Sequence, residues 1–223
     1  MLHGARAARP IRSWLHRLKP RNCSGSGHYT PAVDNSNFIC INEAITLAEE
    51  AALVAYLDPL LKRRRYEKGH WDSVIIKYKE VELPMPQQLP AEIASIINRL
   101  TSESILPSYD HNSAKSSMLA PHLIDLAADG FISPHVDNVR HSGPVLAGLS
   151  LLSSRTMRLQ RSHSDGSLQN GGLEHILGPR SLYMLKGPLR YDFAHSILCA
   201  EGAARRLSLI FRDAAPSPTA PPA

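Results

Sequence analysis

The stretch FISPHVDNV, residues 131–139, is a short run of apolar and β-branched residues set between turn-forming residues. Runs of this kind recur beyond residue 115 and are separated by Gly, Pro, Asn, Asp and Ser, which is typical of strands joined by turns. The other runs are SMLAPHLIDLA (117–127), PVLAGLSLLS (144–153), TMRLQRS (156–162), LEHILG (173–178), SLYMLKG (181–187), YDFAHSIL (191–198) and RRLSLIFRD (205–213). About eight short strands at this spacing predict an antiparallel sandwich or barrel.

Two helices are predicted before the strands. In SNFICINEAITLAEEAALVAYLDPLLKRRR, residues 36–65, apolar residues recur at intervals of three and four after a candidate cap at Asn42. Pro59 is expected to bend or break this helix. The second helix lies in QQLPAEIASIINRLTSES, residues 87–104, where three isoleucines and Leu100 share a face. The predicted fold class is therefore mainly β with flanking helices.

Positive charge is concentrated at the N-terminus. The formal net charge is +5, yet residues 1–33 hold six Lys and Arg and no carboxylate, which leaves 19 Lys and Arg against 20 Asp and Glu in the rest. Ile11, Trp14, Leu15 and Leu18 share one helical face in this opening, a pattern typical of mitochondrial presequences. A basic tail that binds phosphate is the alternative. We expect residues 1–33 to direct the chain to the mitochondrial matrix.

The remaining chain is expected to form one domain over residues 34–213. Cys23, Cys40 and Cys199 make no C-x-x-C pair, so neither a disulfide framework nor a thiolate zinc site is indicated. No apolar run approaches the length of a membrane span. The C-terminal DAAPSPTAPPA holds four prolines and no core-forming residue, which predicts a disordered tail over residues 214–223. We expect a monomer.

The H-x-D of FISPHVDNV carries the candidate chemistry. Side chains alternate along a strand, so His135 and Asp137 are expected to share a face. His195, in YDFAHSIL, is the best candidate for a third ligand. Two imidazoles and one carboxylate form the facial triad of non-haem Fe(II) oxygenases, which leaves open positions on the metal. A loop histidine satisfied by a carbonyl is the alternative for so short a motif.

An arginine-bearing strand follows these residues. In RRLSLIFRD, Arg206, Ser208, Ile210 and Arg212 share one face. An arginine inside an apolar sheet is costly unless it meets an anion, ideally a carboxylate. The expected anion is the distal carboxylate of 2-oxoglutarate, the co-substrate of such oxygenases. Six residues of straight strand span roughly 20 Å, so Arg206 is the stronger candidate and an ion pair is the alternative for Arg212.

The chain carries an H-x-D, then a distal His, then an R-x5-R. This order resembles the signature of the AlkB-homologue Fe(II)/2-oxoglutarate dioxygenases. The phrases LLKRRRYE, HWD, PHVD, AGLSLLS, SLYMLKG, RYDFAHSIL and RRLSLIFR, which span residues 38–212, are similar to the mitochondrial branch of that family. The resemblance implies three Fe(II) ligands, His135, Asp137 and His195, and three residues that hold 2-oxoglutarate, Arg206, Arg212 and Tyr183. For Tyr183, a core aromatic with a locally satisfied hydroxyl is the alternative.

The resemblance also implies a fold and a reaction. The fold is a double-stranded β-helix, or jelly roll, buttressed by the two N-terminal helices, with Fe(II) between its sheets. The reaction is oxidative decarboxylation of 2-oxoglutarate by O₂, coupled to oxidation of a substrate. The chain departs from the family's nucleic-acid demethylases, because it has HLIDLAADG, residues 122–130, where they carry an N-x-Y element. The mitochondrial branch is also expected to lack a nucleotide-recognition lid.

The distribution of charge along the chain helps to choose between classes of substrate. Phosphate contacts dominate nucleic-acid affinity, and the chain beyond residue 33 is not basic, which favours a protein side chain as substrate. The resemblance adds a link to fatty-acid metabolism and programmed necrosis. The run Lys62–Arg65, most simply a set of cations at a helix C-terminus, could with Tyr66, His70 and Trp71 instead bind RNA. Demethylation of mitochondrial transfer RNA is therefore the alternative, and a non-catalytic metal-binding scaffold is the second alternative.

Overall fold

The computed structural model describes residues 37–69, 74–102, 118–163, 165–199 and 201–214. The predicted presequence, His70, Trp71 and the predicted tail beyond Ala214 lie outside these ranges. The strands are β1 (Phe38–Ile41), β2 (Ile75–Glu82), β3 (His122–His135), β4 (Ser142–Leu151), β5 (Arg155–Arg161), β6 (Leu173–Leu177), β7 (Leu182–Leu185), β8 (Phe193–Ile197) and β9 (Arg206–Ala214). The helices are α1 (Leu47–Leu61), the 3-10 helix η2 (Pro86–Gln88), α2 (Ala91–Leu100) and α3 (Pro188–Tyr191).

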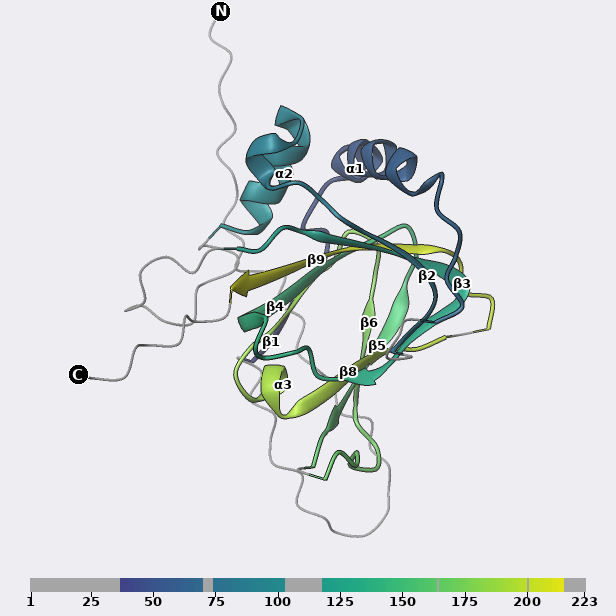
Figure 1. Ribbon diagram of the computed structural model, residues 1–223, viewed down its shortest axis with the longest axis vertical. Coiled ribbons are helices and arrows are strands. Elements are labelled where there is room, and N and C mark those ends of the chain that lie inside the picture. Colours follow the sequence, from purple (N-terminus) through teal and green to yellow (C-terminus); the bar gives the residue numbers. More distant parts are fainter. Residues whose placement is uncertain (1–36, 70–73, 103–117, 164, 200, 215–223) are drawn as a thin grey trace, which may run out of the picture.

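All nine strands belong to one curled antiparallel sheet (Figure 1). Their order is β1-β7-β4-β9-β3-β8-β5-β6, with β2 paired to β3. The long strand β3 takes part in both halves of the sheet, since its residues 122–126 pair with β9 and its residues 132–135 pair with β8. The sheet therefore encloses a space between two layers, and the prediction of a mainly β fold with flanking helices is confirmed.

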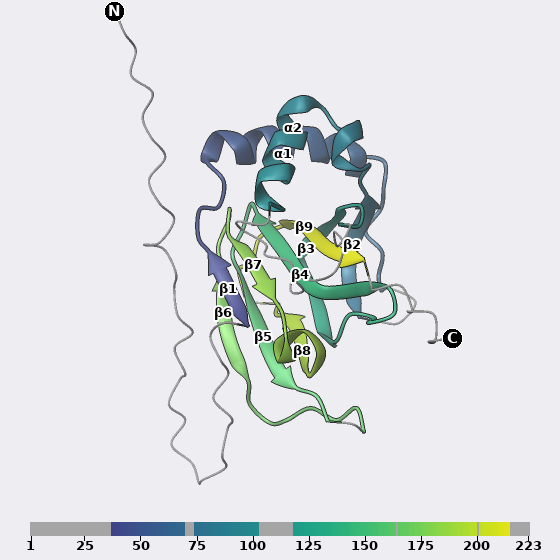
Figure 2. The same ribbon diagram turned by 90° about the vertical axis from the view of Figure 1, so that its left-hand side faces the viewer.

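Side-chain alternation gives the sheet two apolar cores. On β9, Leu207, Leu209 and Phe211 pack toward α1 and α2, while Ile210 points to the space between the layers. Both helices lie together on one face of the sheet in two perpendicular views (Figure 2). None of the helices within the described ranges has the length and apolarity needed to cross a membrane.

The first helix is shorter than the sequence predicts. It begins after Thr46, not Asn42, because Thr46 and Glu49 cap each other's backbone in a capping box. The residues Phe38–Ile41 form β1 instead, since they pair with β7 and bury alternate side chains. Pro59 lies in the last turn, and the helix ends at Leu61. The basic run Lys62–Arg65 follows the C-terminal end of α1, as predicted, and is exposed.

One prediction about the strands is wrong, and one strand was missed. The runs at 117–127 and 131–139 are not two strands but one, because β3 continues through the intervening AADG while paired with β2 on its other side. A register shift between Ile76 and Tyr78, where Lys77 has a φ of 53°, accommodates this irregular part. The strand β2 itself was not predicted, although IIKYKEVE alternates, and the turn α3 was also missed. The second helix is confirmed, with its four predicted apolar residues buried.

Candidate metal centre

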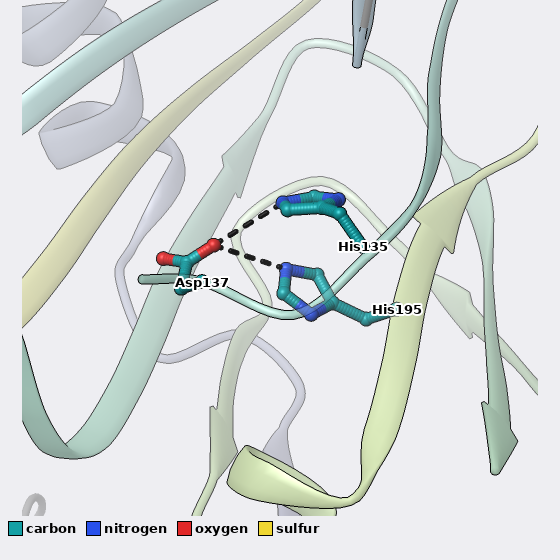
Figure 3. A group of neighbouring side chains, drawn as sticks. All are labelled: His135, Asp137 and His195. Carbon is teal, nitrogen blue, oxygen red and sulfur yellow. Dashed lines mark ion pairs between the residues drawn. The ribbon is translucent and has the colours of Figure 1, made fainter. Parts of the chain in front are cut away.

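The structure brings together the three residues that the sequence predicts as metal ligands (Figure 3). One ligand atom from each of His135, Asp137 and His195 lies within 4.8 Å of the others. Asp137 Oδ1 is 3.2 Å from His135 Nε2 and 3.7 Å from His195 Nε2. The two imidazole rings are 4.2 Å apart between centroids and tilted by 48°. Two nitrogens and one oxygen thus converge on one point, as in a facial triad.

The two residues of the H-x-D are placed differently from the prediction. β3 ends at His135, and Asp137 lies beyond it in the connection to β4. They therefore do not share one face of a strand; the turn of the chain after His135 brings the carboxylate back toward the imidazole. His135 pairs directly with His195 across β3 and β8, which explains how residues sixty positions apart become neighbours.

Ring nitrogens of both histidines are available to bind a metal. His135 Nδ1 lies 2.9 Å from the carbonyl of Ser133, and a proton on Nδ1 in this contact leaves the Nε2 lone pair for a metal. Burial, with the nearby His135 ring, lowers the pKa of His195 to about 3. His195 is thus uncharged at neutral pH, which is the state that coordinates a cation.

Asp137 is held ionised. Burial alone would raise the pKa of this carboxyl, but the contact with the His135 ring and the charge of Arg212 outweigh burial and keep the pKa well below its usual range. Arg212 Nε donates to Asp137 Oδ2 at 2.6 Å. One carboxylate oxygen is therefore taken by arginine, while the other faces the imidazoles. The donor set, two imidazoles and one anionic carboxylate, fits a ferrous ion.

The triad lies at a cavity of about 50 Å³ between the two layers of the sheet. That is several times the ~10–15 Å³ that one water requires. The lining is part apolar and part polar: Ile75, Ile124, Ile132, Leu146, Ile197 and Ile210, with His135, Asp137, Tyr183, His195, Arg206, Ser208 and Arg212. All six residues predicted for the site therefore reach one cavity.

Arg206 is a buried cation at this cavity, with 1% of its surface exposed. Its Nε donates to Ser150 Oγ at 2.9 Å and its Nη1 to Ser208 Oγ at 3.2 Å. Its Nη2 has no hydrogen-bond partner among the described residues. Burial lowers the pKa of Arg206 to about 10, so the side chain remains charged at neutral pH. A buried charge with an open donor is what a site for an anion requires.

Tyr183 lines the same cavity from β7 and is buried. Burial raises its pKa, so the phenol stays protonated and can donate a hydrogen bond at neutral pH. Its ring lies against Gly148, its partner in β4; a Cβ at Gly148 would come within 2.4 to 2.6 Å of three atoms of the phenol. Gly148 thus makes room for Tyr183.

Sequence reasoning missed Gly148 and Ser150. Both lie in β4 next to cavity-lining residues: Gly148 accommodates the ring of Tyr183, and Ser150 Oγ accepts from Arg206. A glycine inside a strand pattern, as in AGLSLLS, is a signal of close approach and could have drawn attention to Gly148. The role of Ser150 depends on which strand pairs with which, and no local pattern carries that information.

Known proteins provide an independent comparison. No family model matches the chain. Two curated proteins match it, both named alpha-ketoglutarate-dependent dioxygenase alkB homolog 7, mitochondrial. The Bos taurus protein is 36% identical over 178 residues, which is 76% of this chain and 75% of the relative. The Mus musculus protein is 37% identical over 176 residues, or 74% and 73% of the two chains.

Solved structures agree on the fold. The structure of OsALKBH1 superposes with a TM-score of 0.56 at 13% identity and covers 79% of this chain and 97% of its own. A Trichoplax adhaerens prolyl hydroxylase, in complex with a hypoxia inducible factor oxygen degradation domain peptide fragment, has a TM-score of 0.55 at 12% identity and covers 80% and 84%. The predicted jelly roll is confirmed.

The names of the curated relatives bear on both activity and location. Each is named as a dioxygenase that depends on alpha-ketoglutarate, that is 2-oxoglutarate, and each is named as mitochondrial. The predictions of a mitochondrial enzyme of this class are therefore confirmed. At this identity and coverage, the chain belongs to the family of mitochondrial alpha-ketoglutarate-dependent dioxygenases named alkB homolog 7.

Proposed function

We propose that this dioxygenase uses Fe(II) held by His135, Asp137 and His195 to oxidise a protein side chain in mitochondria. The observation that carries the proposal is one cavity that holds both the triad and a buried guanidinium with an open donor, Arg206. A metal site and an anion site in one enclosed space are what a metal-chelating dicarboxylate such as 2-oxoglutarate requires.

Each side chain has a task in this proposal. Arg206 would donate Nη2 to the distal carboxylate of 2-oxoglutarate, and Tyr183 would add its phenol hydroxyl. Arg212 holds Asp137 Oδ2 and, from the same cavity wall, supports the co-substrate's charge. The isoleucines that line the cavity keep water away, which strengthens these charged contacts.

The bound metal would supply the redox chemistry, in which O₂ and 2-oxoglutarate give succinate, CO₂ and an oxidised substrate. The protein's contribution is geometric. His135 keeps its Nε2 lone pair directed at the site through its Ser133 contact, and Arg212 leaves Asp137 Oδ1 as the oxygen that faces the imidazoles.

Succinate release without added substrate tests the enzyme and the ligand set. We expect slow release that requires Fe(II) and 2-oxoglutarate and disappears in His135→Ala. His163→Ala, which changes an exposed histidine away from the cavity, serves as the matched control and should retain full release. Succinate release that persists in His135→Ala would contradict the assignment of His135 as a metal ligand. No succinate release from the wild type would favour the non-catalytic scaffold.

The charges around the cavity favour a protein substrate over RNA. Glu80 and Glu82 pair with Ile124 and His122 across β2 and β3, so they lie on the same face of the sheet as the cavity-lining Ile124. His122 Nε2 is 3.4 Å from Glu80 Oε2, and the pKa of His122, which burial lowers, also responds to Arg212 and Asp137. Two carboxylates thus lie on the face of β2 and β3 that leads to the cavity, where they would repel a phosphate backbone.

The alternative, demethylation of mitochondrial transfer RNA, has its own supporting observation. A second cavity of about 620 Å³ lies at the C-terminal end of α1 and is lined by Lys62, Tyr66, Lys79 and Arg205, with Asp58. The exposed residues Arg63–Arg65 adjoin it. Arg205 is already paired with Asp58 and Asp125, however, and this cavity is on the helix-covered side of the sheet. The basic surface therefore does not adjoin the triad.

Mass spectrometry of mitochondrial proteins and transfer RNAs, with and without active enzyme, separates the two substrates. We expect oxygen-atom additions on peptides and unchanged RNA methylation, both compared with His135→Ala. As a second measure, charge reversal of Arg63–Arg65 should leave substrate turnover unchanged. Demethylated transfer RNA together with lost turnover in the charge-reversed variant would decide for RNA.

The links to fatty-acid metabolism and programmed necrosis form part of the proposal and rest on the family resemblance. Cells that express His135→Ala at the level of the wild type provide the test, since the protein is then present while the metal centre is lost. We expect altered fatty-acid oxidation and altered necrotic death in these cells. Unchanged behaviour in both assays would separate the chemistry from these processes.

A further inference from the structure

The segment that carries Asp137 is held by a buried arginine outside the cavity. Arg190, in α3, has 2% of its surface exposed. Its Nη1 donates to the carbonyl of Asp137 at 3.1 Å, and its Nη2 donates to Ser142 Oγ at 2.6 Å and to the Ser142 carbonyl at 3.3 Å. One guanidinium thus forms hydrogen bonds at both ends of the connection between β3 and β4.

This connection needs such support. Asp137 has left strand β3, so no ladder of backbone bonds fixes it. Within the connection, Asn138 accepts from Arg140, His141 and Ser142, which forms a turn after Asp137 but does not tie Asp137 to the rest of the fold. Arg212 holds the carboxylate, and Arg190 holds the main chain.

A buried arginine is a costly way to satisfy two carbonyls and a hydroxyl. Burial lowers the pKa of Arg190, the charge of Asp137 acts in the opposite direction, and Nε has no partner among the described residues. Desolvation of a charge costs several kcal/mol. The guanidinium of arginine, however, is planar and has five N–H donors, so it can fix several acceptors in one orientation. A lysine cannot do this.

We propose that Arg190 is a positioning residue for the metal centre, which sets the Asp137 main chain so that Oδ1 faces the two imidazoles. α3 leads directly into β8, the strand of His195, so Arg190 also joins the segments that carry the second and third ligands. This inference rests on the proposed metal centre, and it predicts an effect on metal affinity that is separate from fold stability.

Arg155 offers a matched control. It is also a buried guanidinium, with 3% exposed, and its Nη2 donates to the carbonyls of Ala127 and Ala128 at 3.1 and 3.0 Å. Its Nε and Nη1 have no partner among the described residues. Arg155 thus bonds to backbone carbonyls at a similar cost, but these carbonyls lie in the middle of β3 and not next to a residue proposed to bind the metal.

The test measures Mn(II) binding to the apoprotein by calorimetry, with thermal unfolding of the same samples. We expect Arg190→Met to weaken Mn(II) binding about 10- to 100-fold, as loss of outer-shell support does at other metal sites. Arg155→Met should leave Mn(II) affinity within about twofold of wild type, whatever its effect on the melting temperature. Methylguanidinium added to Arg190→Ala should restore binding, and methylammonium should not.

The milder variants Arg190→Lys and Ser142→Ala extend the test to a protein that folds normally, and both should weaken Mn(II) binding less than Arg190→Met. Wild-type Mn(II) affinity in a folded Arg190 variant overturns the positioning role, whatever its melting temperature. An equal loss of affinity in Arg155→Met overturns it as well. Failure of the wild type to bind Mn(II) instead overturns the proposed metal centre, and the two failures are thereby distinguished.

Discussion

Arg206 is the most informative single side chain in the cavity, because its charge is buried and one of its donors is open. We expect Arg206→Met to raise the KM for 2-oxoglutarate about 100-fold, since a charge-assisted hydrogen bond to a buried partner is worth about 3 kcal/mol. The Fe(II) requirement should hardly change, because Arg206 contacts two serines and not the triad. Steady-state kinetics with each component varied in turn provides the measurement.

The same substitution separates binding from folding. Replacement of a buried charge by an apolar side chain of similar length is often neutral or stabilising, so apo Arg206→Met should melt no lower than the wild type. Equal effects on the 2-oxoglutarate and Fe(II) requirements would argue that Arg206 acts through the fold and not through the co-substrate.

Gly148 tests the placement of Tyr183. A Cβ at Gly148 would lie 2.4 Å from the phenol ring, so Gly148→Ala must displace Tyr183 and should cost about 1–3 kcal/mol of unfolding free energy. It should also raise the KM for 2-oxoglutarate if the phenol contacts the co-substrate. In a double-mutant cycle, Gly148→Ala should cost much less in a Tyr183→Ala background, and additive losses would count against the steric contact.

For single residues, the sequence predicts which side chains come together at the site. It does not predict the path of the backbone that places them there. Alternation along RRLSLIFRD places Arg206 and Arg212 on one face, and both do line the cavity. Arg212 therefore reaches the cavity despite its distance from Arg206 along β9. It forms an ion pair with Asp137, which is the alternative role that the sequence offered for Arg212. The departure of Asp137 from β3 is set by the fold around it, which no local pattern encodes.

Among the secondary-structure elements, α1 is positioned by its first turn. Thr46 and Glu49 form the capping box, and Glu49 also meets Arg99 of α2 at 2.5 Å. We expect Thr46→Ala to lower the free energy of unfolding by about 1 kcal/mol, because the cap on the Glu49 N–H is lost. Chemical denaturation measures this loss, and Thr46→Ser, which keeps the hydroxyl, should restore most of it.

Helices and strands were predicted well where the apolar residues recur with a single period, helical or alternating. α2 and most strands of the second half follow their periodicity, and their apolar faces are buried as expected. The errors occur where pairing overrides local signals. β1 is only FICI and exists because β7 lies beside it, and β3 passes through an Asp-Gly pair because β2 supports it.

For the whole molecule, composition and pattern predicted a mainly β chain with flanking helices, and this is confirmed. The curled topology came from the resemblance, because strand order depends on contacts between residues far apart in sequence. The predicted boundaries at 33 and 214 remain predictions, although the described elements all fall between Phe38 and Ala214.

The N-terminal boundary gives a prediction at this scale. Removal of residues 1–33 takes away six cations and the expected presequence, so it should abolish import into isolated mitochondria while the succinate release of the purified protein is retained. A fluorescent fusion of residues 1–33 alone provides the control and should be imported. Import of the truncated chain would place the targeting signal elsewhere.

The open donor of Arg206 also bears on how long the enzyme lasts. A ligand that binds only the folded chain stabilises it by about 2.7 kcal/mol at a hundredfold excess over its Kd, and here the ligand would also complete the bonding of a buried cation. Mitochondrial proteases act on chains that open transiently. The abundance of this enzyme should therefore rise and fall with the supply of 2-oxoglutarate, so that the protein level itself records the metabolic state of the organelle.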